Sequence, residues 1–277
     1  MEIFVHRGGR INSNTISAFQ KCVDLGVDGI EVDLSMSKDG EPMIYHPELV
    51  EPVTQDPLYM SWRSIRQDYP QIPHLNDLIE FLNKNPKLQC LLDVKIDSQP
   101  LRHKIRFSSM QGTTKENKKK VVLHSPAFKQ IYVTSPRIRM PLAGLHTNVQ
   151  VLLSTRVLMP QIQIHIIEIV PTNRTILRGI RKYSPLIVSF GWLPNSPTSR
   201  LLFYFLTKTR LLDLRQLQSL RGKGVRLMGG IVNTEEELRY FVDFQEYAPP
   251  KPLVDIILTD EPERALKFRK NLKCSCL

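Results

Sequence analysis

The stretch MEIFVHRGGRINSNTISAFQKCVDLG (residues 1–26) contains one complete strand–loop–helix unit, and this unit is the best guide to the fold class. Its first five residues are mostly apolar and predict a short buried strand. His6, Arg7 and two glycines follow at the point where that strand should end, which is a common way to present polar side chains at the rim of a sheet. The stretch therefore predicts a strand whose carboxyl end carries polar groups.

The second half of the same stretch has the pattern of an amphipathic helix. Its apolar residues recur at helical spacing: Ile16, Phe19, Cys22 and Val23. Gly26 is expected to end this helix, because glycine readily adopts the left-handed conformation found there. Three polar residues can cap its start, namely Asn12, Ser13 and Asn14.

Similar units recur along all 277 residues. Further strands are predicted at 29–34, 88–96, 119–125, 149–155, 185–192, 225–233 and 254–262. Helices are predicted at 75–83, 211–224 and 234–244, whereas the pattern at 162–170 does not decide between strand and helix. Eight strands with helices between most of them favour an α/β fold of the (β/α)8 TIM-barrel type over an open sheet. We expect one barrel domain at 1–265, with an irregular middle region, and a basic tail at 266–277.

The composition is that of an ordinary globular protein, with 42% hydrophobic and 23% charged residues. No apolar run reaches the roughly 18 residues that a membrane-spanning helix needs, and no secretory signal precedes His6. The four cysteines lack the spacing of a zinc site, and a reducing compartment fits them. We therefore expect a cytoplasmic protein that can also lie peripherally on a membrane or lipid-droplet surface.

The net charge of +11 is unevenly distributed along the chain. Residues 1–101 carry 9 Lys and Arg against 15 Asp and Glu, whereas residues 102–182 carry 15 against 2. This predicts a surface that attracts anions beside a site that concentrates carboxylates. Phosphate, anionic lipid and nucleic acid all fit the basic part. Nucleic-acid binding is not expected, because no aromatic–basic or helix-turn-helix pattern accompanies the charge.

Two predicted strands place carboxylates on one face. In GIEVDL (29–34), Glu31 and Asp33 alternate with aliphatic residues, and in LLDVKI (91–96), Asp93 and Lys95 do the same. Carboxylates that point together into a barrel would repel one another, and a divalent cation relieves that repulsion; oxygen ligands favour Mg²⁺ or Ca²⁺. The alternative is that Glu31 and Asp33 lie on the solvent face of an antiparallel edge strand.

These segments, in their order along the chain, resemble the glycerophosphodiester phosphodiesterase family. The resemblance rests on HRGG, NT, AF, GVDGIEVDLSMSKDGEPMIYH, LLDVKI, GIVN and ILTDEP, and it runs from His6 to about Ala265 with a loosely matched middle third. Within the family, the chain is most similar to the fungal phosphatidylglycerol phospholipase C branch. The resemblance implies a metal-dependent TIM-barrel hydrolase. Its substrate would be a glycerophosphodiester or the head group of a glycerophospholipid such as phosphatidylglycerol, from which it would release glycerol phosphate.

The resemblance also implies roles for individual residues. His6 and His46 resemble the pair that acts as general acid and general base. Arg7 resembles the phosphate-binding arginine, and Lys95 would balance the negative charge of the phosphate. Three acids would bind the divalent metal, either Mg²⁺ or Ca²⁺: Glu31, Asp33 and Asp93.

Four positions depart from the usual pattern of the family. His46 is followed by Pro47 where the family has aspartate, and Asp93 stands where glutamate is frequent. Ser13 replaces a glutamate, and Gly230 replaces an aromatic residue. These changes motivate an alternative function, in which a catalytically impaired barrel binds anionic lipid or acts as a scaffold.

Two further segments suggest contact with membranes. CSCL (274–277) fits a prenylation box at Cys274 with basic residues just upstream, although a frayed basic tail is the alternative. RLLFYFL (200–206) predicts a buried helix or, alternatively, a segment that contacts a membrane directly. The expected partners are therefore a glycerophosphodiester or glycerophospholipid substrate and a membrane surface, contacted through the basic surface and the tail.

Overall fold

Eight parallel strands form the centre of the molecule. The computed structural model describes residues 1–11, 13–39, 41–46, 56–94, 131–135, 163–168, 171–183, 187–192, 196–243 and 251–274. The strands are β1 (Glu2–His6), β2 (Gly29–Met36), β4 (Gln89–Val94), β5 (Ile131–Ser135), β6 (Gln163–Glu168), β7 (Ile187–Phe190), β8 (Arg226–Gly230) and β11 (Ile256–Thr259). Each pairs with the next in this order, and β11 pairs with β1. This closed ring confirms the predicted TIM barrel.

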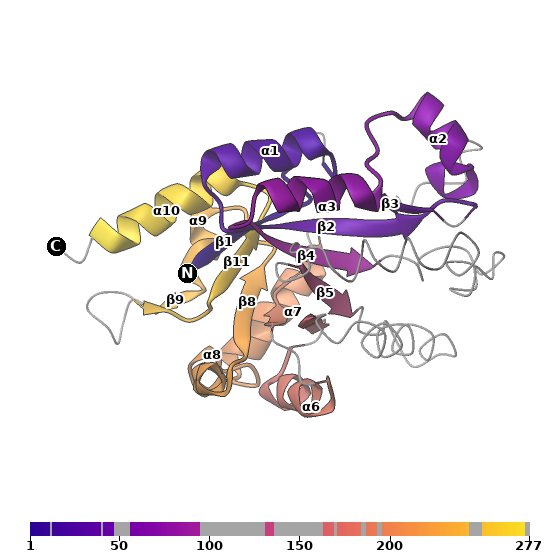
Figure 1. Ribbon diagram of the computed structural model, residues 1–277. Coiled ribbons are helices and arrows are strands. Elements are labelled where there is room, and N and C mark those ends of the chain that lie inside the picture. Colours follow the sequence, from indigo (N-terminus) through magenta and orange to yellow (C-terminus); the bar gives the residue numbers. More distant parts are fainter. Residues whose placement is uncertain are drawn as a thin grey trace.

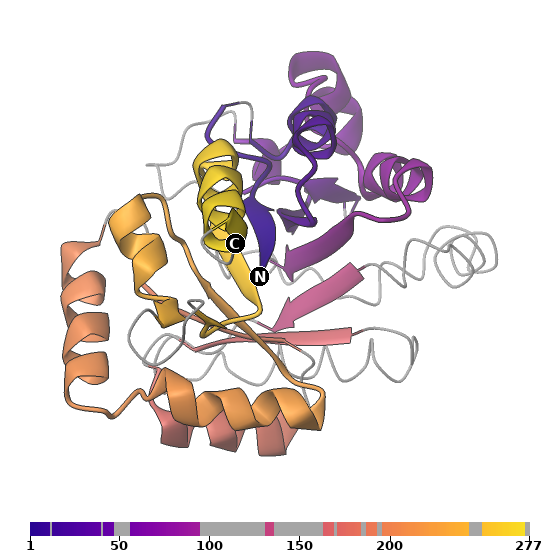
Figure 2. The ribbon, with the colours of Figure 1, turned by 90° about the vertical axis from the view of Figure 1, so that its left-hand side faces the viewer.

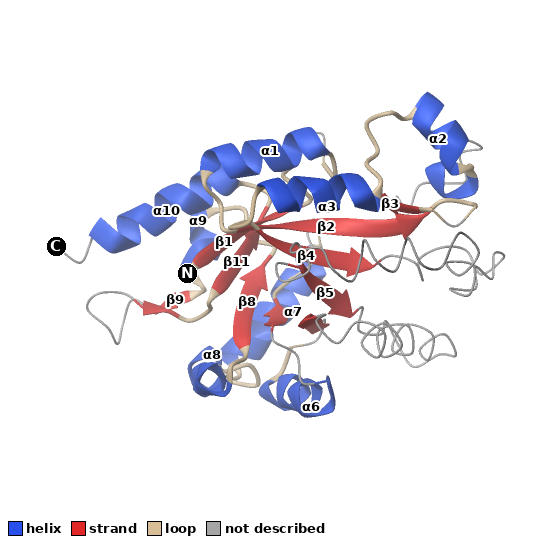
Figure 3. Ribbon diagram, in the orientation of Figure 1, coloured by secondary structure: helices blue, strands red, loops and turns tan. Residues whose placement is uncertain are grey.

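The helices lie outside the strands (Figures 1, 2 and 3). They are α1 (Ile16–Leu25), α2 (Trp62–Asp68), α3 (Leu75–Lys84), α6 (Asn173–Tyr183), α7 (Pro197–Lys208), α8 (Leu214–Leu217), α9 (Glu235–Arg239) and α10 (Pro262–Cys274), with 3-10 turns η1 (Pro57–Tyr59) and η5 (Gln218–Lys223). The short β3 (Pro42–Ile44) runs antiparallel to β2, and β9 (Val242–Asp243) pairs with β10 (Lys251–Pro252). Within the described ranges, no helix combines the length and hydropathy that crossing a bilayer requires.

Two barrel positions are filled by segments other than the predicted ones. The predicted strands at 119–125 and 149–155 lie outside the described residues, and the ring between β4 and β7 is completed by β5 and β6. The undecided segment 162–170 contains β6 and is therefore a strand. The described ring has the predicted eight strands, and two of its positions belong to β5 and β6, which were not among the strands predicted.

The helix predictions held less well near the carboxyl end of the chain. The predicted helix at 211–224 is only the four-residue α8 followed by a 3-10 turn. The predicted helix at 234–244 ends at Arg239, and β9 begins three residues later. The second helix is short because Val242 and Asp243 pair with β10 as a strand.

The core is built on both faces of the strands. On the outer face of β2, Ile30, Val32 and Leu34 pack with α1 and α3 in one buried apolar cluster. Inside the barrel, a second cluster seals the interior below the carboxyl ends of the strands: Phe4, Leu91, Ile187, Met228, Ile256 and Leu258. Gly29 makes room for Phe4, because a Cβ at residue 29 would come within 2.6 Å of the Phe4 ring. Polar side chains above this apolar layer therefore gather at one end of the barrel.

Candidate active site

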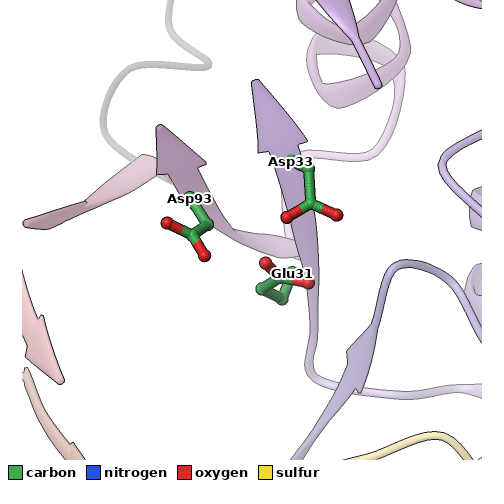
Figure 4. A group of neighbouring side chains, drawn as sticks. All are labelled: Glu31, Asp33 and Asp93. Carbon is green, nitrogen blue, oxygen red and sulfur yellow. The ribbon is translucent and has the colours of Figure 1, made fainter. Parts of the chain in front are cut away.

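Three buried carboxylates meet at the carboxyl ends of β2 and β4. One carboxylate oxygen from each of Glu31, Asp33 and Asp93 lies within 4.8 Å of the others (Figure 4). All three residues are buried, and Asp33 is completely inaccessible. β2 is paired on both sides, with β1 and with β4, so the alternative of a solvent-exposed edge strand is wrong.

Strand register explains why these carboxylates converge. Asp33 is directly opposite Asp93 in the parallel pairing of β2 with β4, and Glu31 is opposite His6 in the pairing of β2 with β1. Residues two apart share a face, so Glu31 and Asp33 both point into the barrel while the aliphatic residues between them face the helices. Three oxygen donors brought together in a buried place form a donor set that suits a hard divalent cation.

His6 is held by an aspartate from the opposite end of the chain. Its Nδ1 donates a hydrogen bond to Oδ1 of Asp260 at 2.7 Å, and its Nε2 lies 3.9 Å from Oε2 of Glu31. Asp260 is itself fixed by Asn233, whose Nδ2 donates to Oδ2 of Asp260 at 2.8 Å and whose Oδ1 accepts from the Asp260 amide at 2.8 Å. The contact with Asp260 therefore orients the imidazole and leaves Nε2 facing the carboxylates.

The charges around His6 favour its protonated form. Burial lowers the pKa of His6, but the hydrogen bond to Asp260 and the nearby Glu31 carboxylate outweigh it, so the pKa lies above its ordinary value. Burial raises the pKa of Asp260, but the hydrogen bonds from His6 and Asn233 outweigh that, so the pKa of this carboxyl is lowered. Both shifts describe the same imidazolium–carboxylate pair.

Arg7 faces the carboxylates through both its backbone and its side chain. Its amide donates to Oε2 of Glu31 at 3.1 Å, and its Nε lies 2.8 Å from Oδ2 of Asp33. The backbone of Arg7 has φ = 55°, a left-handed conformation that is unfavourable for a residue with a side chain. Gly8, which follows in the same turn, packs so closely that a Cβ would come within 2.9 Å of Phe19. The tight turn after β1 therefore presents the guanidinium to the site.

Asn14 also belongs to the site, and it corrects the predicted helix cap. Its Nδ2 donates to Oδ2 of Asp33 at 2.9 Å, and its Oδ1 accepts from the Asp33 amide at 3.1 Å. Because Asn14 is used in this way, the N-cap of α1 is Thr15, whose side chain accepts from the amide of Ala18. The expectation that Asn12, Ser13 or Asn14 caps α1 was therefore wrong, whereas Gly26 ends the helix as predicted.

The remaining two predicted residues are less directly placed. His46 is half-buried two residues beyond β3, and the amide of its neighbour Tyr45 donates to the carbonyl of Asp33 at 3.0 Å. This backbone contact brings the His46 segment alongside the carboxylate strand. Lys95 lies outside the described residues. Five predicted site residues are thus brought together: His6, Arg7, Glu31, Asp33 and Asp93.

The sequence arguments assigned no role in the active site to three residues that support it: Asn14, Asn233 and Asp260. Asn14 and Asp260 were part of the quoted NT and ILTDEP blocks, and Asn233 ended the GIVN block. The available signal was their position, because Asp260 directly follows β11 and Asn233 comes three residues after β8. Polar residues just beyond parallel strands of a barrel point to the end that carries active sites.

Comparison with known proteins finds similarity to one family. Residues 6–138, just under half of the chain, match the model of the glycerophosphoryl diester phosphodiesterase family. A glycerophosphodiester phosphodiesterase of Caldanaerobacter subterraneus is 43% identical over 54 residues, which is 19% of this chain and 22% of that relative. One from Bacillus altitudinis is 24% identical over 289 residues, covering 98% of this chain and 99% of the relative.

Solved structures agree with the fold. A putative glycerophosphoryl diester phosphodiesterase from Silicibacter pomeroyi superposes with a TM-score of 0.69 at 15% identity, covering 99% of this chain and 94% of that one. A phosphodiesterase from Oleispira antarctica, solved with the product sn-glycerol-3-phosphate, gives 0.60 at 15% identity, covering 98% and 97%. The chain therefore has the barrel fold of these enzymes.

Proposed function

We propose that this chain, a homologue of the glycerophosphodiester phosphodiesterases, is a metal-dependent phosphoric diester hydrolase that cleaves a glycerophosphodiester. The family match and the full-length relative support the reaction class. The observation that carries the proposal is the convergence of Glu31, Asp33 and Asp93 within 4.8 Å, next to His6 and Arg7. An acidic oxygen donor set beside a guanidinium and an imidazole suits a phosphate ester better than an uncharged substrate.

The three carboxylates would hold the metal ion, either Mg²⁺ or Ca²⁺. Their oxygens are hard donors, they are buried, and their mutual repulsion needs a counter-charge that one arginine does not fully supply. The bound ion would offset negative charge on the phosphoryl oxygens. Arg7 would add to this, because a guanidinium has donors to spare for a phosphate oxygen while its Nε faces Asp33.

Two histidines would move the protons. His6 has its Nδ1 fixed by Asp260, so Nε2 is the atom that exchanges a proton with the substrate. His46 would act as the second group, on the segment that the Tyr45 amide ties to Asp33, and Lys95 would bind the phosphate as a second cation. With Asp260 holding an imidazolium, His6 is suited to donate its proton to the leaving oxygen.

Hydrolysis of glycerophosphocholine by the purified chain tests the proposal. We expect His6→Ala to lower kcat/KM by roughly 10²–10⁴-fold, as loss of an acid–base group does. Glu31→Gln should also lower it strongly, because one of the three carboxylates that would hold the metal is lost. Glu80→Gln is the matched control, since Glu80 is exposed on α3 and should leave turnover unchanged. Circular dichroism verifies folding of each variant. Wild-type turnover in both site variants would refute the proposal.

A narrower substrate is the head group of a glycerophospholipid such as phosphatidylglycerol, cleaved as by a phospholipase C. Parallel assays on glycerophosphodiesters in solution and on phosphatidylglycerol vesicles separate these substrates, because a lipid-directed enzyme should prefer the aggregated one.

The departures at Pro47 and Asp93 motivate the alternative of an impaired barrel that binds anionic lipid or acts as a scaffold. Vesicle binding without any metal-dependent turnover would favour that alternative.

A further inference from the structure

We propose that the exposed face of α7 docks on the surface of an anionic phospholipid membrane. The inference goes beyond the proposed hydrolysis, because the residues that carry it are separate from the candidate active site. It concerns where on the molecule a lipid surface is met, and it holds whether or not the chain is catalytically active.

One face of α7 is apolar and exposed, which is unusual for a helix packed on a barrel. Leu201 is 69% exposed and Phe205 is 56% exposed, and they are four residues apart on the same face. Leu202 on the same helix and Leu211, three residues beyond its end, are also exposed, with 38% and 51% of their surfaces accessible. The opposite face of the helix is anchored in the core by the buried Phe203 and Leu206. The sequence left open whether RLLFYFL is a buried helix or a segment that contacts a membrane. The structure shows a helix with one buried face and one exposed face.

Basic residues predominate in the segment around this face, and the arginine on α7 itself, Arg200, is ion-paired with Glu237. Residues 169–212 contain seven Lys and Arg and no Asp or Glu. Lys208 and Arg210 are exposed at the end of α7 beside Leu211, and the amide of Asn173 at the start of α6 donates to the Leu211 carbonyl at 2.9 Å. This contact joins α6 to the same region, where three further arginines are exposed: Arg174, Arg178 and Arg181.

This combination of features selects a lipid surface as the occupant. A helix with large apolar side chains flanked by Lys and Arg inserts its apolar face at the boundary of head groups and acyl chains, while its cations meet anionic lipids. A second copy of this chain would bring the same exposed cations of α6 and the end of α7 against each other. An anionic membrane complements both the apolar and the basic parts of the surface.

Co-sedimentation with vesicles tests the docking surface. The full chain is mixed, in EDTA to prevent hydrolysis, with vesicles of phosphatidylcholine alone or with about a third phosphatidylserine. Wild type should bind the anionic vesicles more tightly, and added salt should weaken that binding. Leu201→Ser/Phe205→Ser should bind roughly tenfold or more weakly, because each side chain contributes apolar area. Lys208→Gln/Arg210→Gln should bind anionic vesicles about tenfold more weakly, since each cation contributes a several-fold effect.

Matched controls distinguish binding through this surface from non-specific binding to vesicles. Leu25→Ser removes another exposed leucine, on α1, and Arg63→Gln removes another exposed cation, on α2; neither should change binding. Failure of wild type to bind anionic vesicles, or equal binding by the Leu201→Ser/Phe205→Ser variant, would overturn the inference. A third result would also overturn it: wild type forms a dimer in sedimentation velocity, the Leu201→Ser/Phe205→Ser variant does not, and neither protein binds vesicles.

Hydrolysis of a soluble substrate tests the proposed function separately from the docking surface. All four variants should hydrolyse glycerophosphocholine as wild type does, because none of the changed residues belongs to the candidate active site. If no form of the chain hydrolyses it, the proposed function fails, and the vesicle experiment still decides the docking surface.

Discussion

Replacing Asp260 by asparagine tests the organisation of the site most directly. The change removes one negative charge and keeps the size of the side chain. Nδ1 of His6 and Oδ1 of Asp260 are 2.7 Å apart, and both side chains are largely buried. A hydrogen bond between charged groups contributes about 1.5–3 kcal/mol and a neutral one about 0.5–1.5 kcal/mol. We therefore expect Asp260→Asn to lower the free energy of unfolding by about 1–2 kcal/mol where His6 is protonated.

The pH dependence of this loss follows from the direction of the two shifts. The pKa of His6 is raised by folding, so its stabilising contribution is fully present below its ordinary value of 6.5 and is lost as pH rises through the folded pKa. The pKa of Asp260 is lowered by folding, so its contribution is present above its ordinary value of 3.8 and is lost as pH falls through the folded pKa. The difference between wild type and Asp260→Asn should thus be largest between these two ordinary values.

Urea unfolding followed by circular dichroism measures this difference. Wild type and Asp260→Asn are compared in EDTA at pH 5.5, below the ordinary His pKa of 6.5, and at pH 9, well above that ordinary value. Asp68→Asn is the control, because Asp68 is exposed on α2. NMR titration should also show a lower His6 pKa in Asp260→Asn than in wild type. A stability gap that is equal at both pH values, or larger at pH 9, would refute the assignment of a charged His6–Asp260 pair.

Three other changes have expected outcomes. Asn14→Ala should destabilise the fold by roughly 2–3 kcal/mol in thermal or urea unfolding, because Asp33 loses two buried hydrogen bonds; an unchanged midpoint would contradict this. Gly29→Ala should cost about 1–3 kcal/mol, since the new methyl group meets the buried Phe4 ring, and the counter-result is wild-type stability. Mg²⁺ or Ca²⁺ at about 100 times its Kd for wild type should raise the free energy of unfolding of wild type by about 2.7 kcal/mol, measured by calorimetry. The same ion should stabilise Asp93→Asn much less, and equal stabilisation of both forms would exclude Asp93 as a ligand.

The sequence was most informative where the governing interactions are local. The alternation of Glu31 and Asp33 with aliphatic residues predicted which side chains share a face, because the period of a strand is a property of the backbone itself. The end of α1 at Gly26 was predictable for the same reason. The segments that resemble the phosphodiesterase family assigned site roles to His6 and Arg7, and the structure places both residues beside the carboxylates.

The sequence was least informative where distant segments compete for one place. Asn14 is a good helix cap in isolation, but its contacts with Asp33 leave that role to Thr15. The strands β5 and β6 could not be chosen from their own patterns, because several β-branched stretches lie between β4 and β7 and closure of the barrel decides which of them pair.

The repeated strand–helix units, the carboxylate face of β2 and the barrel class could be predicted from the amino-acid sequence, because all of them follow from short-range periodicity. The contact of Asp260 with His6 could be found only in the folded chain. These residues are 254 positions apart, and they meet because β11 pairs with β1 to close the ring. Ring closure is a property of all eight strands together, so no local pattern near His6 could have supplied its partner.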